Sequence, residues 1–362
     1  TGASSGTWQN TLVPMFMPNP DAHAEKSTKY DLGLDLSLLG KLNLIADVYL
    51  DIRTDILTLD NSIMNYYGNN YYFSNIGKMI SKGLELTGIW QDNFGDFNYS
   101  LSGMLSYNTN NIDYMAEVAP AHEYNAKTGR PFGTFIGLEA DGFYDVADFN
   151  DDGSLVEGIP TPAFGNVQPG DIRYVDLDDN GVIDQNDVTQ IGKSIFPEWT
   201  YSFGGAINYK GFDFNILFQG IAGASVNLLE NWNQTVAFVD NRTVFPIAED
   251  AWAYYPSQNV DTRSTAKYPR LTTQSNANNY RGSSFWIKDR DYLKIRNIEL
   301  GYDFALNNSL NLENVEKLRI FVNVVNPFTW SKLLDEYKMD PESIYGGYPS
   351  IKSFNAGISF TF

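Results

Sequence analysis

Apolar and polar side chains alternate strictly along much of the chain. In the C-terminal segment KSFNAGISFTF, every second residue from Phe354 to Phe362 is apolar, while the residues between them are polar or small. A period of two residues is typical of a β-strand with one apolar face. The same alternation predicts further strands at residues 29–39, 41–57, 81–91, 97–109, 199–209, 212–219, 287–304 and 316–328. Several of these segments reach the length of about 9–11 residues that crosses a bilayer at a tilt.

The links between these predicted strands alternate between short and long. The short links fall at residues 39–41, 92–96, 210–211 and 305–315. The long links fall near residues 58–80, 110–198, 224–286 and 329–351. Membrane barrels have short periplasmic turns and long extracellular loops, whereas soluble sandwiches have no reason to segregate links by length.

The pattern therefore predicts an all-β fold, a transmembrane antiparallel β-barrel with about 9–11 strands in this chain. Residues 29–362 would form the barrel region, and residues 133–144 are a candidate for an additional strand. Residues 1–28 are expected to be a loop or the end of a preceding extracellular segment. A closed barrel of about ten strands and a part of a larger barrel both remain open at this point.

Composition agrees with a barrel. Hydrophobic residues make up 43% of the chain, yet the mean hydropathy is only −0.30, as expected when lipid-facing and lumen-facing residues alternate. The net charge of −19 opposes binding to nucleic acid and disfavours anionic substrates. The chain has no cysteine and only two histidines, which excludes thiol catalysis and an all-histidine zinc site. The opening segment TGASSGTWQN lacks the features of a signal peptide, so we expect the chain to start within a longer protein.

One segment has the ligand spacing of a twelve-residue calcium loop. Oxygen ligands at positions 1, 3, 5, 7, 9 and 12, with glycine at position 6, wrap a hard divalent cation. The matching residues here are Asp176, Asp178, Asn180, Val182 through its carbonyl, Asp184 and Asp187. Aspartate replaces the usual glutamate at position 12, so bidentate ligation there is less assured. Magnesium and an Asx-rich turn without an ion are the alternatives. We expect a structural calcium that stiffens the long loop 110–198. A weaker copy begins at Asp148 and has Ile159 at position 12.

Aromatic and amide side chains alternate in the predicted loop 58–80. Aromatic faces stack on sugar rings and amides satisfy hydroxyl groups, so this pattern predicts a substrate contact. The candidate contact residues are Tyr66, Tyr67, Tyr71 and Tyr72. The alternatives are an aromatic belt at the membrane surface or a contact with a partner protein.

Charged residues on the predicted strands are expected to face the lumen, because a lysine or arginine facing lipid costs about 2–4 kcal/mol at mid-bilayer. They are Asp47, Asp51 and Glu85, and the run Lys288-Asp289-Arg290-Asp291 with Lys294 and Arg296. For this run, pairing across strands is an equal expectation, and substrate binding is the alternative. The sequence offers one histidine beside an acid, His122 next to Glu123, and nothing else that converges on it. We therefore predict no catalytic residues and no enzyme activity.

Four stretches resemble one family. They are QPGDIRYVDLDDNGVIDQNDVTQIGKSIFPEWTYSFGGAINYKGFDFNILFQGIAGASVN (168–227), SSFWIKDRDYLKIRNIELGYDF (283–304), NIGKMISKGLELTGIW (75–90), and VNPFTWSKLLDEYKMDPES followed by YPSIKSFNAGISFTF. From Lys29 onward, nearly the whole chain resembles the C-terminal region of the SusC/RagA family of TonB-dependent outer-membrane importers.

This resemblance implies a 22-stranded barrel of which the chain forms the C-terminal part. It also implies an N-terminal plug and further strands of the same transporter, a contact with the TonB complex through that missing portion, and a SusD-like surface lipoprotein as partner. The implied function is import of nutrient oligosaccharides across the cell outer membrane, with this chain supplying wall and surface loops. Peptide import is the alternative within the family. A ten-stranded outer-membrane enzyme and a surface structural protein are alternatives of another class.

Overall fold

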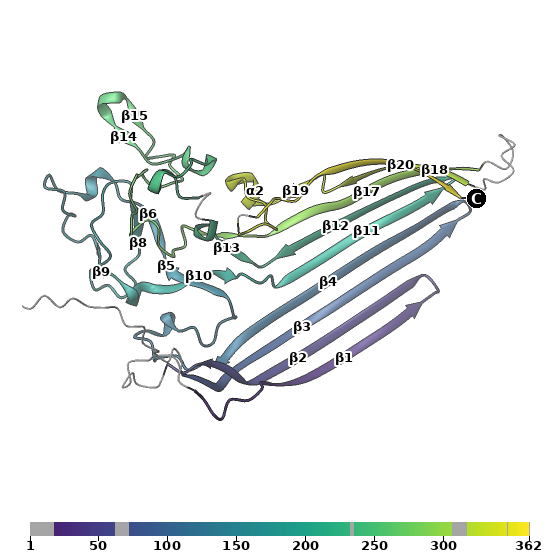
Figure 1. Ribbon diagram of the computed structural model, residues 1–362, viewed down its shortest axis with the longest axis horizontal. Coiled ribbons are helices and arrows are strands. Elements are labelled where there is room, and N and C mark those ends of the chain that lie inside the picture. The colour runs from purple at the N-terminus through teal and green to yellow at the C-terminus, as the bar shows by residue number, and fades with distance from the viewer. Residues whose placement is uncertain (1–17, 62–71, 232–234, 306–316, 346, 362) are drawn as a thin grey trace, which may run out of the picture.

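The computed structural model describes residues 18–61, 72–231, 235–305, 317–345 and 347–361. Its main feature is one antiparallel sheet in which neighbouring long strands follow chain order (Figure 1). The strands of this sheet are β1 (Lys26–Leu38), β2 (Leu42–Leu59), β3 (Phe73–Phe94), β4 (Phe97–Tyr114), β11 (Trp199–Tyr209), β12 (Phe212–Ala222), β17 (Tyr292–Ala305), β18 (Lys317–Val325), β19 (Thr329–Trp330) and β20 (Ser353–Thr361). The short β19 pairs with β17 beyond the end of β18. The predicted antiparallel β architecture is thus confirmed.

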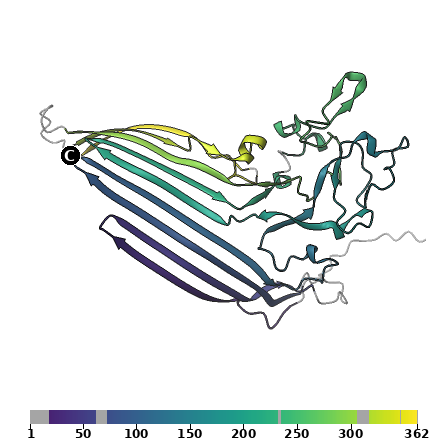
Figure 2. The same ribbon diagram turned by 180° about the vertical axis from the view of Figure 1, so that it is seen from behind.

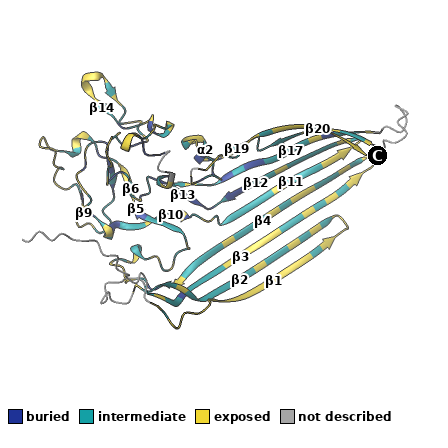
Figure 3. Ribbon diagram, in the orientation of Figure 1, coloured by how far each residue is buried: buried dark blue, intermediate teal, exposed yellow. Residues whose placement is uncertain are grey.

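The register keeps apolar residues on one face of the sheet and polar residues on the other. Val48 on β2 pairs with Leu32 on β1 and Leu84 on β3, while the adjacent Asp47 pairs with Gly33 and Glu85. Antiparallel partners point to the same side, so the apolar set forms one continuous face. That face is uncovered, and Leu32 is 77% exposed. Figure 3 shows the sheet as largely intermediate or exposed.

Aromatic residues stand near both ends of the apolar face. Toward the short turns, Trp90 donates a hydrogen bond from Nε1 to the hydroxyl of Tyr99 over 3.1 Å. Toward the long loops, Tyr107 packs against Trp199 with ring centroids 4.4 Å apart. This placement is the one that aromatic girdles take at the two interfaces of a membrane barrel.

Short turns and long loops lie at opposite ends of the sheet, which we call the turn rim and the cap rim (Figures 1 and 2). At the turn rim, Lys210 and Gly211 join β11 to β12 with φ of 47° and 89°. Two successive positive φ values are typical of a type I′ turn, whose twist matches the twist of the two strands in a β-hairpin. Within the described residues the sheet stays open, with β1 and β20 as its edges.

The described parts of three long loops, residues 115–198, 223–291 (without 232–234) and 326–352 (without 346), pack together at the cap rim and form a unit that we call the cap. Its short strands are β5 (Thr134–Leu138), β6 (Ala140–Phe143), β7 (Thr161–Pro162), β8 (Ile172–Tyr174), β9 (Val182–Ile183), β10 (Val188–Ser194), β13 (Ser225–Asn227), β14 (Tyr254–Tyr255), β15 (Val260–Asp261) and β16 (Ile287–Asp289). Its helical segments are α2 (Lys332–Tyr337) and 3-10 turns at Glu123–Asn125, Val146–Asp148, Gln185–Asp187, Leu228–Asn231, Val239–Asn241, Pro246–Ala248 and Pro256–Gln258.

The cap has the hydrophobic core that the open sheet lacks. Trp286, Leu138 and Leu333 are each at most 1% exposed and come from the three different loops. Burying them together holds the loops in one arrangement. No helix in the described part of the chain is long and apolar enough to span a membrane.

Two expectations about strands need correction. Residues 133–144 form β5 and β6, which pair with β10 and β8 inside the cap rather than joining the large sheet. The segment 287–304 is not one strand, because β16 pairs with β13 and β17 begins only at Tyr292. The break is held by Asp291, whose Oδ1 accepts a hydrogen bond from the backbone N–H of Gly223 over 2.9 Å.

Candidate functional site

The acidic segment 176–187 lies in the cap and folds into a compact loop. Asp176, Asp178 and Asp187 each offer one carboxylate oxygen, and these oxygens lie within 4.8 Å of one another. Gly181 has a φ of 82° and its N–H donates to Oδ2 of Asp176 over 2.7 Å, which closes the wrap of the loop. Asp187 is fully buried. Three carboxylates this close repel one another unless a cation or donors offset their charge.

The other predicted ligands hold the loop by local hydrogen bonds. Asn180 accepts from the N–H of Val182 over 2.7 Å and donates to Oδ2 of Asp178 over 3.0 Å. Asp184 accepts from the N–H of Asn186 over 2.6 Å, and it does not join the group of three carboxylates among the described residues. The weaker copy is arranged differently, since Asp152 accepts from the N–H and the hydroxyl of Ser154.

A second cap segment covers the acidic loop. Asn125 donates from Nδ2 to the carbonyl of Asn186 over 2.9 Å, which ties the segment 122–125 to the loop. His122 stacks on Tyr124 and places Nε2 3.6 Å from Oδ2 of Asp178. Burial of Tyr124 and the nearby negative charges, that of Asp178 first, raise the pKa of its hydroxyl. The histidine thus meets an acid of the loop and not its sequence neighbour, Glu123.

The tyrosines proposed from sequence as substrate contacts fall largely outside the described residues. Tyr66, Tyr67 and Tyr71 lie in the segment 62–71, which the structure does not describe. Tyr72 is half-buried just before β3, and its carbonyl accepts from the N–H of Asp60 over 2.8 Å. Their role as substrate contacts stays a prediction.

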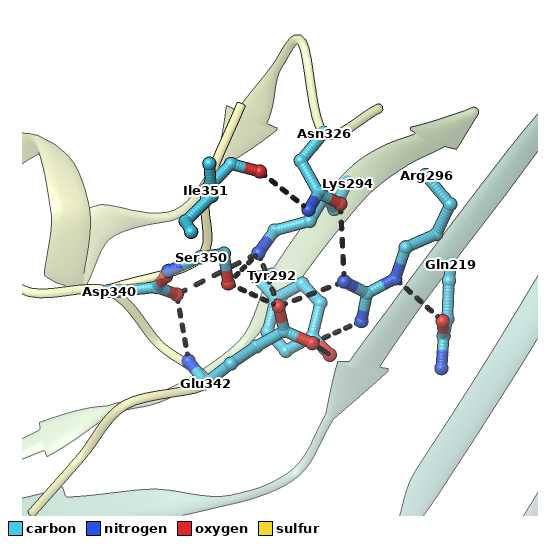
Figure 4. A network of polar contacts seen from close by, with 9 residues as sticks. All are labelled: Gln219, Tyr292, Lys294, Arg296, Asn326, Asp340, Glu342, Ser350 and Ile351. Atoms are coloured by element: carbon cyan, nitrogen blue, oxygen red, sulfur yellow. Dashed lines mark hydrogen bonds and ion pairs between the residues drawn. The ribbon is translucent and has the colours of Figure 1, made fainter. Parts of the chain in front are cut away.

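Asp47, Asp51, Glu85 and Lys294 lie on the polar face as expected, and Lys294 and Arg296 join a network with the cap (Figure 4). The run 288–291 does not lie on the large sheet, because Lys288 and Asp289 belong to β16 in the cap and Arg290 and Asp291 precede β17. Lys294 is only 1% exposed, and its Nζ contacts the carboxylate of Glu342 and donates to the hydroxyl of Ser350 over 3.0 Å. Arg296 also binds Glu342 and donates from Nε to Gln219 over 2.7 Å. Tyr292 donates to the same carboxylate over 2.9 Å.

Glu342 therefore joins the loop 326–352 to β17. Burial alone raises the pKa of its carboxyl, but hydrogen bonds from Arg296, Lys294 and Tyr292 outweigh that effect and hold the pKa at about 2. Sequence patterning missed Glu342, because it lies in a loop without periodicity. The only available signal was its place in the stretch VNPFTWSKLLDEYKMDPES, which carried the family resemblance.

A polar ladder continues across the same face nearer the turn rim. Arg319 on β18 binds Asp213 on β12 and Glu299 on β17. Asn297 donates to Asn215 over 3.0 Å. These bonds cross three strands, so the polar face is stabilised by its own side chains.

Comparison with known proteins identifies the family of this chain and several relatives. The model of a family described as "TonB dependent receptor-like, beta-barrel" matches residues 3–326. TonB-dependent receptor P3 of Formosa agariphila is 27% identical over 98% of this chain and 36% of its own length. TonB-dependent receptor SusC of Bacteroides thetaiotaomicron is 26% identical over 98% of this chain and 34% of its own length. The chain thus spans about a third of the curated relatives it matches.

Solved structures show the same fold. The RagAB peptide importer in its closed-closed state aligns with a TM-score of 0.65 at 21% identity, covering 95% of this chain and 36% of that one. Its open-open state aligns with the same TM-score at 19% identity. The relatives are receptors and not enzymes, which decides against a barrel enzyme. Because the family model covers most of the sequence, the chain belongs to the TonB-dependent receptor-like β-barrel family.

Proposed function

We propose that this chain forms part of the wall and surface loops of an outer-membrane transporter that imports nutrient oligosaccharides with energy from the TonB complex. The observation that carries the proposal is the register of the sheet, which keeps an uncovered apolar face and a polar face apart across nine long strands. An apolar face flanked by aromatic rings fits lipid, and the polar face fits a water-filled lumen. The cap would then lie outside the cell.

The parent assembly needs more than these residues. The plug, the remaining strands and the segment that contacts TonB would come from the rest of the same transporter, since the chain spans about a third of its relatives. A SusD-like surface lipoprotein is the proposed partner at the cap, consistent with the likeness to SusC and to RagAB.

The substrate class is the finer part of the proposal. We favour oligosaccharides, with Tyr66, Tyr67, Tyr71 and Tyr72 as candidate contacts, because aromatic and amide groups alternate there. Import of peptides is the alternative, because the structurally similar RagAB is described as a peptide importer.

We also propose that the loop 176–187 holds a structural calcium ion. The three clustered carboxylates of Asp176, Asp178 and Asp187 support it, and Asn180, the carbonyl of Val182 and Asp184 complete the candidate ligand set. Hard oxygen donors suit calcium. The ion would offset the repulsion among the carboxylates and stiffen the part of the cap that segment 122–125 covers.

The test of transport uses the full-length transporter in cells that lack their own copy. Uptake of labelled neutral oligosaccharides and of labelled peptides is followed with and without a functional TonB complex. Import of oligosaccharides that stops without TonB supports the proposal. TonB-dependent import of peptides alone favours the alternative, and no TonB-dependent uptake of either class contradicts both. Co-purification of a surface lipoprotein tests the partner.

A further inference from the structure

A polar cavity of about 420 Å³ opens where the cap meets the large sheet. Strands β3, β4 and β11 supply one wall, and segments 131–134 and 190–198 of the cap supply the other. The register puts Ser106 opposite Thr200, and Asn108 follows two residues later on the same, polar face of β4. The cavity therefore opens toward the inside of the barrel and not toward lipid.

Two exposed phenyl rings stand at this cavity. Phe196 lines it, and Phe132 stacks on Phe196 with ring centroids 6.1 Å apart and planes 18° from parallel. Both rings are more than half exposed, at 56% for Phe132 and 54% for Phe196. Exposed aromatic pairs of this kind provide apolar contact area at a binding surface.

Hydrogen bonds fix the backbone that carries the two rings. The hydroxyl of Ser194, which is 6% exposed, donates to the carbonyl of Phe132 over 2.7 Å and accepts from the N–H of Phe196 over 3.1 Å. The N–H of Phe132 donates to Oδ1 of Asn110 on β4 over 2.7 Å. The backbone segments that carry the two rings are thus tied to each other and to β4, which reduces the ordering that a ligand must impose.

Several polar groups of the cavity have no partner within the described protein. The structure gives no side-chain hydrogen bond or ion pair there to Asn108, Thr200, Lys193 or Glu198. A cavity that offers an amide, a hydroxyl, a cation and an anion beside an aromatic platform can satisfy many hydroxyl groups at once. Lys193 and Glu198 offset each other in charge, so the lining has no net attraction for a polyanion.

We propose that this cavity binds a neutral oligosaccharide, with a sugar ring against Phe132 and Phe196 and its hydroxyls on Asn108 and Thr200. The inference rests on the proposed import function and gives it a subsite on the path from cap to lumen. The CH groups of a sugar ring suit an aromatic face, and the hydroxyls suit donors and acceptors that are otherwise unpaired. An extended peptide is the competing occupant.

The test measures binding to the purified full-length transporter in detergent. The probes are neutral gluco-, galacto-, manno- and xylo-oligosaccharides and, separately, a mixture of short peptides. Phe132→Ala/Phe196→Ala should weaken oligosaccharide binding by about tenfold or more, as loss of a central aromatic anchor does. Asn108→Ala provides a second variant that leaves Phe132 and Phe196 unchanged, and it should weaken binding as well. The matched control is Phe328→Ala/Trp330→Ala, another exposed stacked pair, in which Trp330 pairs on the apolar face.

Each outcome decides one question. Weaker binding in both cavity variants with an unchanged control supports the subsite. Unchanged binding in the cavity variants overturns it, and binding of peptides but not of oligosaccharides to the wild-type protein overturns the substrate class. Cellular uptake is measured in parallel. Binding that depends on the cavity without any uptake would contradict the import function and leave the subsite standing.

Discussion

Arg270 donates a hydrogen bond from Nε to Oδ1 of Asp171 over 2.6 Å, and this pair joins two loops that are 99 residues apart in sequence. Asp171 is fully buried and also accepts from Asn276 over 3.0 Å and from Asn279 over 2.8 Å. A buried carboxylate is tolerated only when charge and donors compensate its desolvation. The pair is therefore a buried, charged connection between loops 115–198 and 223–291.

We expect Asp171→Ala to destabilise the cap by about 3–5 kcal/mol, because it leaves the buried donors of Asn279 and the charge of Arg270 without a partner. The measurement is limited proteolysis with cleavage sites mapped by mass spectrometry. Cuts should appear in loop 223–291 while the large sheet stays protected. The control, Asp141→Ala, removes an exposed pair with Arg173 and should change stability by about 0–1 kcal/mol. Equal protection in both variants would contradict the role given to Asp171.

We expect the loop 326–352 to detach from the sheet in acid. The pKa of Glu342 falls from 4.5 to about 2 in the folded state. A lowered pKa gives stability that is fully present above about 4.5 and is lost as pH falls toward about 2. Because the chain has no cysteine, a spin label on Tyr348→Cys, at a site 86% exposed, reports the loop alone. Its mobility should rise below about pH 4.5.

The variant Glu342→Gln is the control for this titration. It removes the charge and weakens the bonds to Arg296 and Lys294, a loss of about 1–3 kcal/mol. The label should then be mobile at neutral pH and show little further change in acid. A label that stays immobile in this variant at every pH would show that other contacts hold the loop.

We expect calcium to bind at the loop 176–187 and chelation to make that loop more sensitive to protease. Asp178→Asn keeps the shape of the side chain but removes one charge, and it should weaken calcium binding by about tenfold or more. The measurement is titration calorimetry on chelator-treated protein. Asp152→Asn, in the weaker copy of the motif, should leave the affinity unchanged. Equal affinities in the wild type and Asp178→Asn would contradict the proposed site.

We expect an arginine on the apolar face to destabilise the barrel far more than one on the polar face. Leu101 on β4 pairs with Trp90 and Gly205 on the apolar face, and the next residue, Ser102, points to the other side. Leu101 lies between the aromatic levels of Tyr99 and Tyr107, so Leu101→Arg should cost about 1–3 kcal/mol, between the values for the interface and for mid-bilayer, measured by urea unfolding of the full-length protein in lipid vesicles. Ser102→Arg should cost much less. If Ser102→Arg destabilised the protein more than Leu101→Arg, the two faces of the sheet would be assigned wrongly.

Local patterning was enough to predict the long strands and the faces of their residues. A strand has a period of two, so Val48 and Asp47 must point to opposite sides whatever their neighbours are. The spacing of Asp176, Asp178 and Asp187 was likewise visible in sequence, because a twelve-residue loop brings its own ligands together. Its occupation by calcium stays a prediction.

The structure of the cap could not be predicted in this way. Residues 133–144 alternate like a barrel strand, but their partners lie in β8 and β10, and only the folded chain decides which edge they meet. The same holds for the break at Asp291, which depends on a hydrogen bond to Gly223, 68 residues earlier.

The sequence by itself thus determined the strands, their two faces and the segregation of short and long links, since each depends on neighbours within a few residues. Tertiary structure alone decided that Asp171 meets Arg270, that Glu342 meets Lys294 and that Phe132 meets Phe196. These pairs are 99, 48 and 64 residues apart. No short-range period encodes such contacts, because they depend on how three loops bury one core around Trp286.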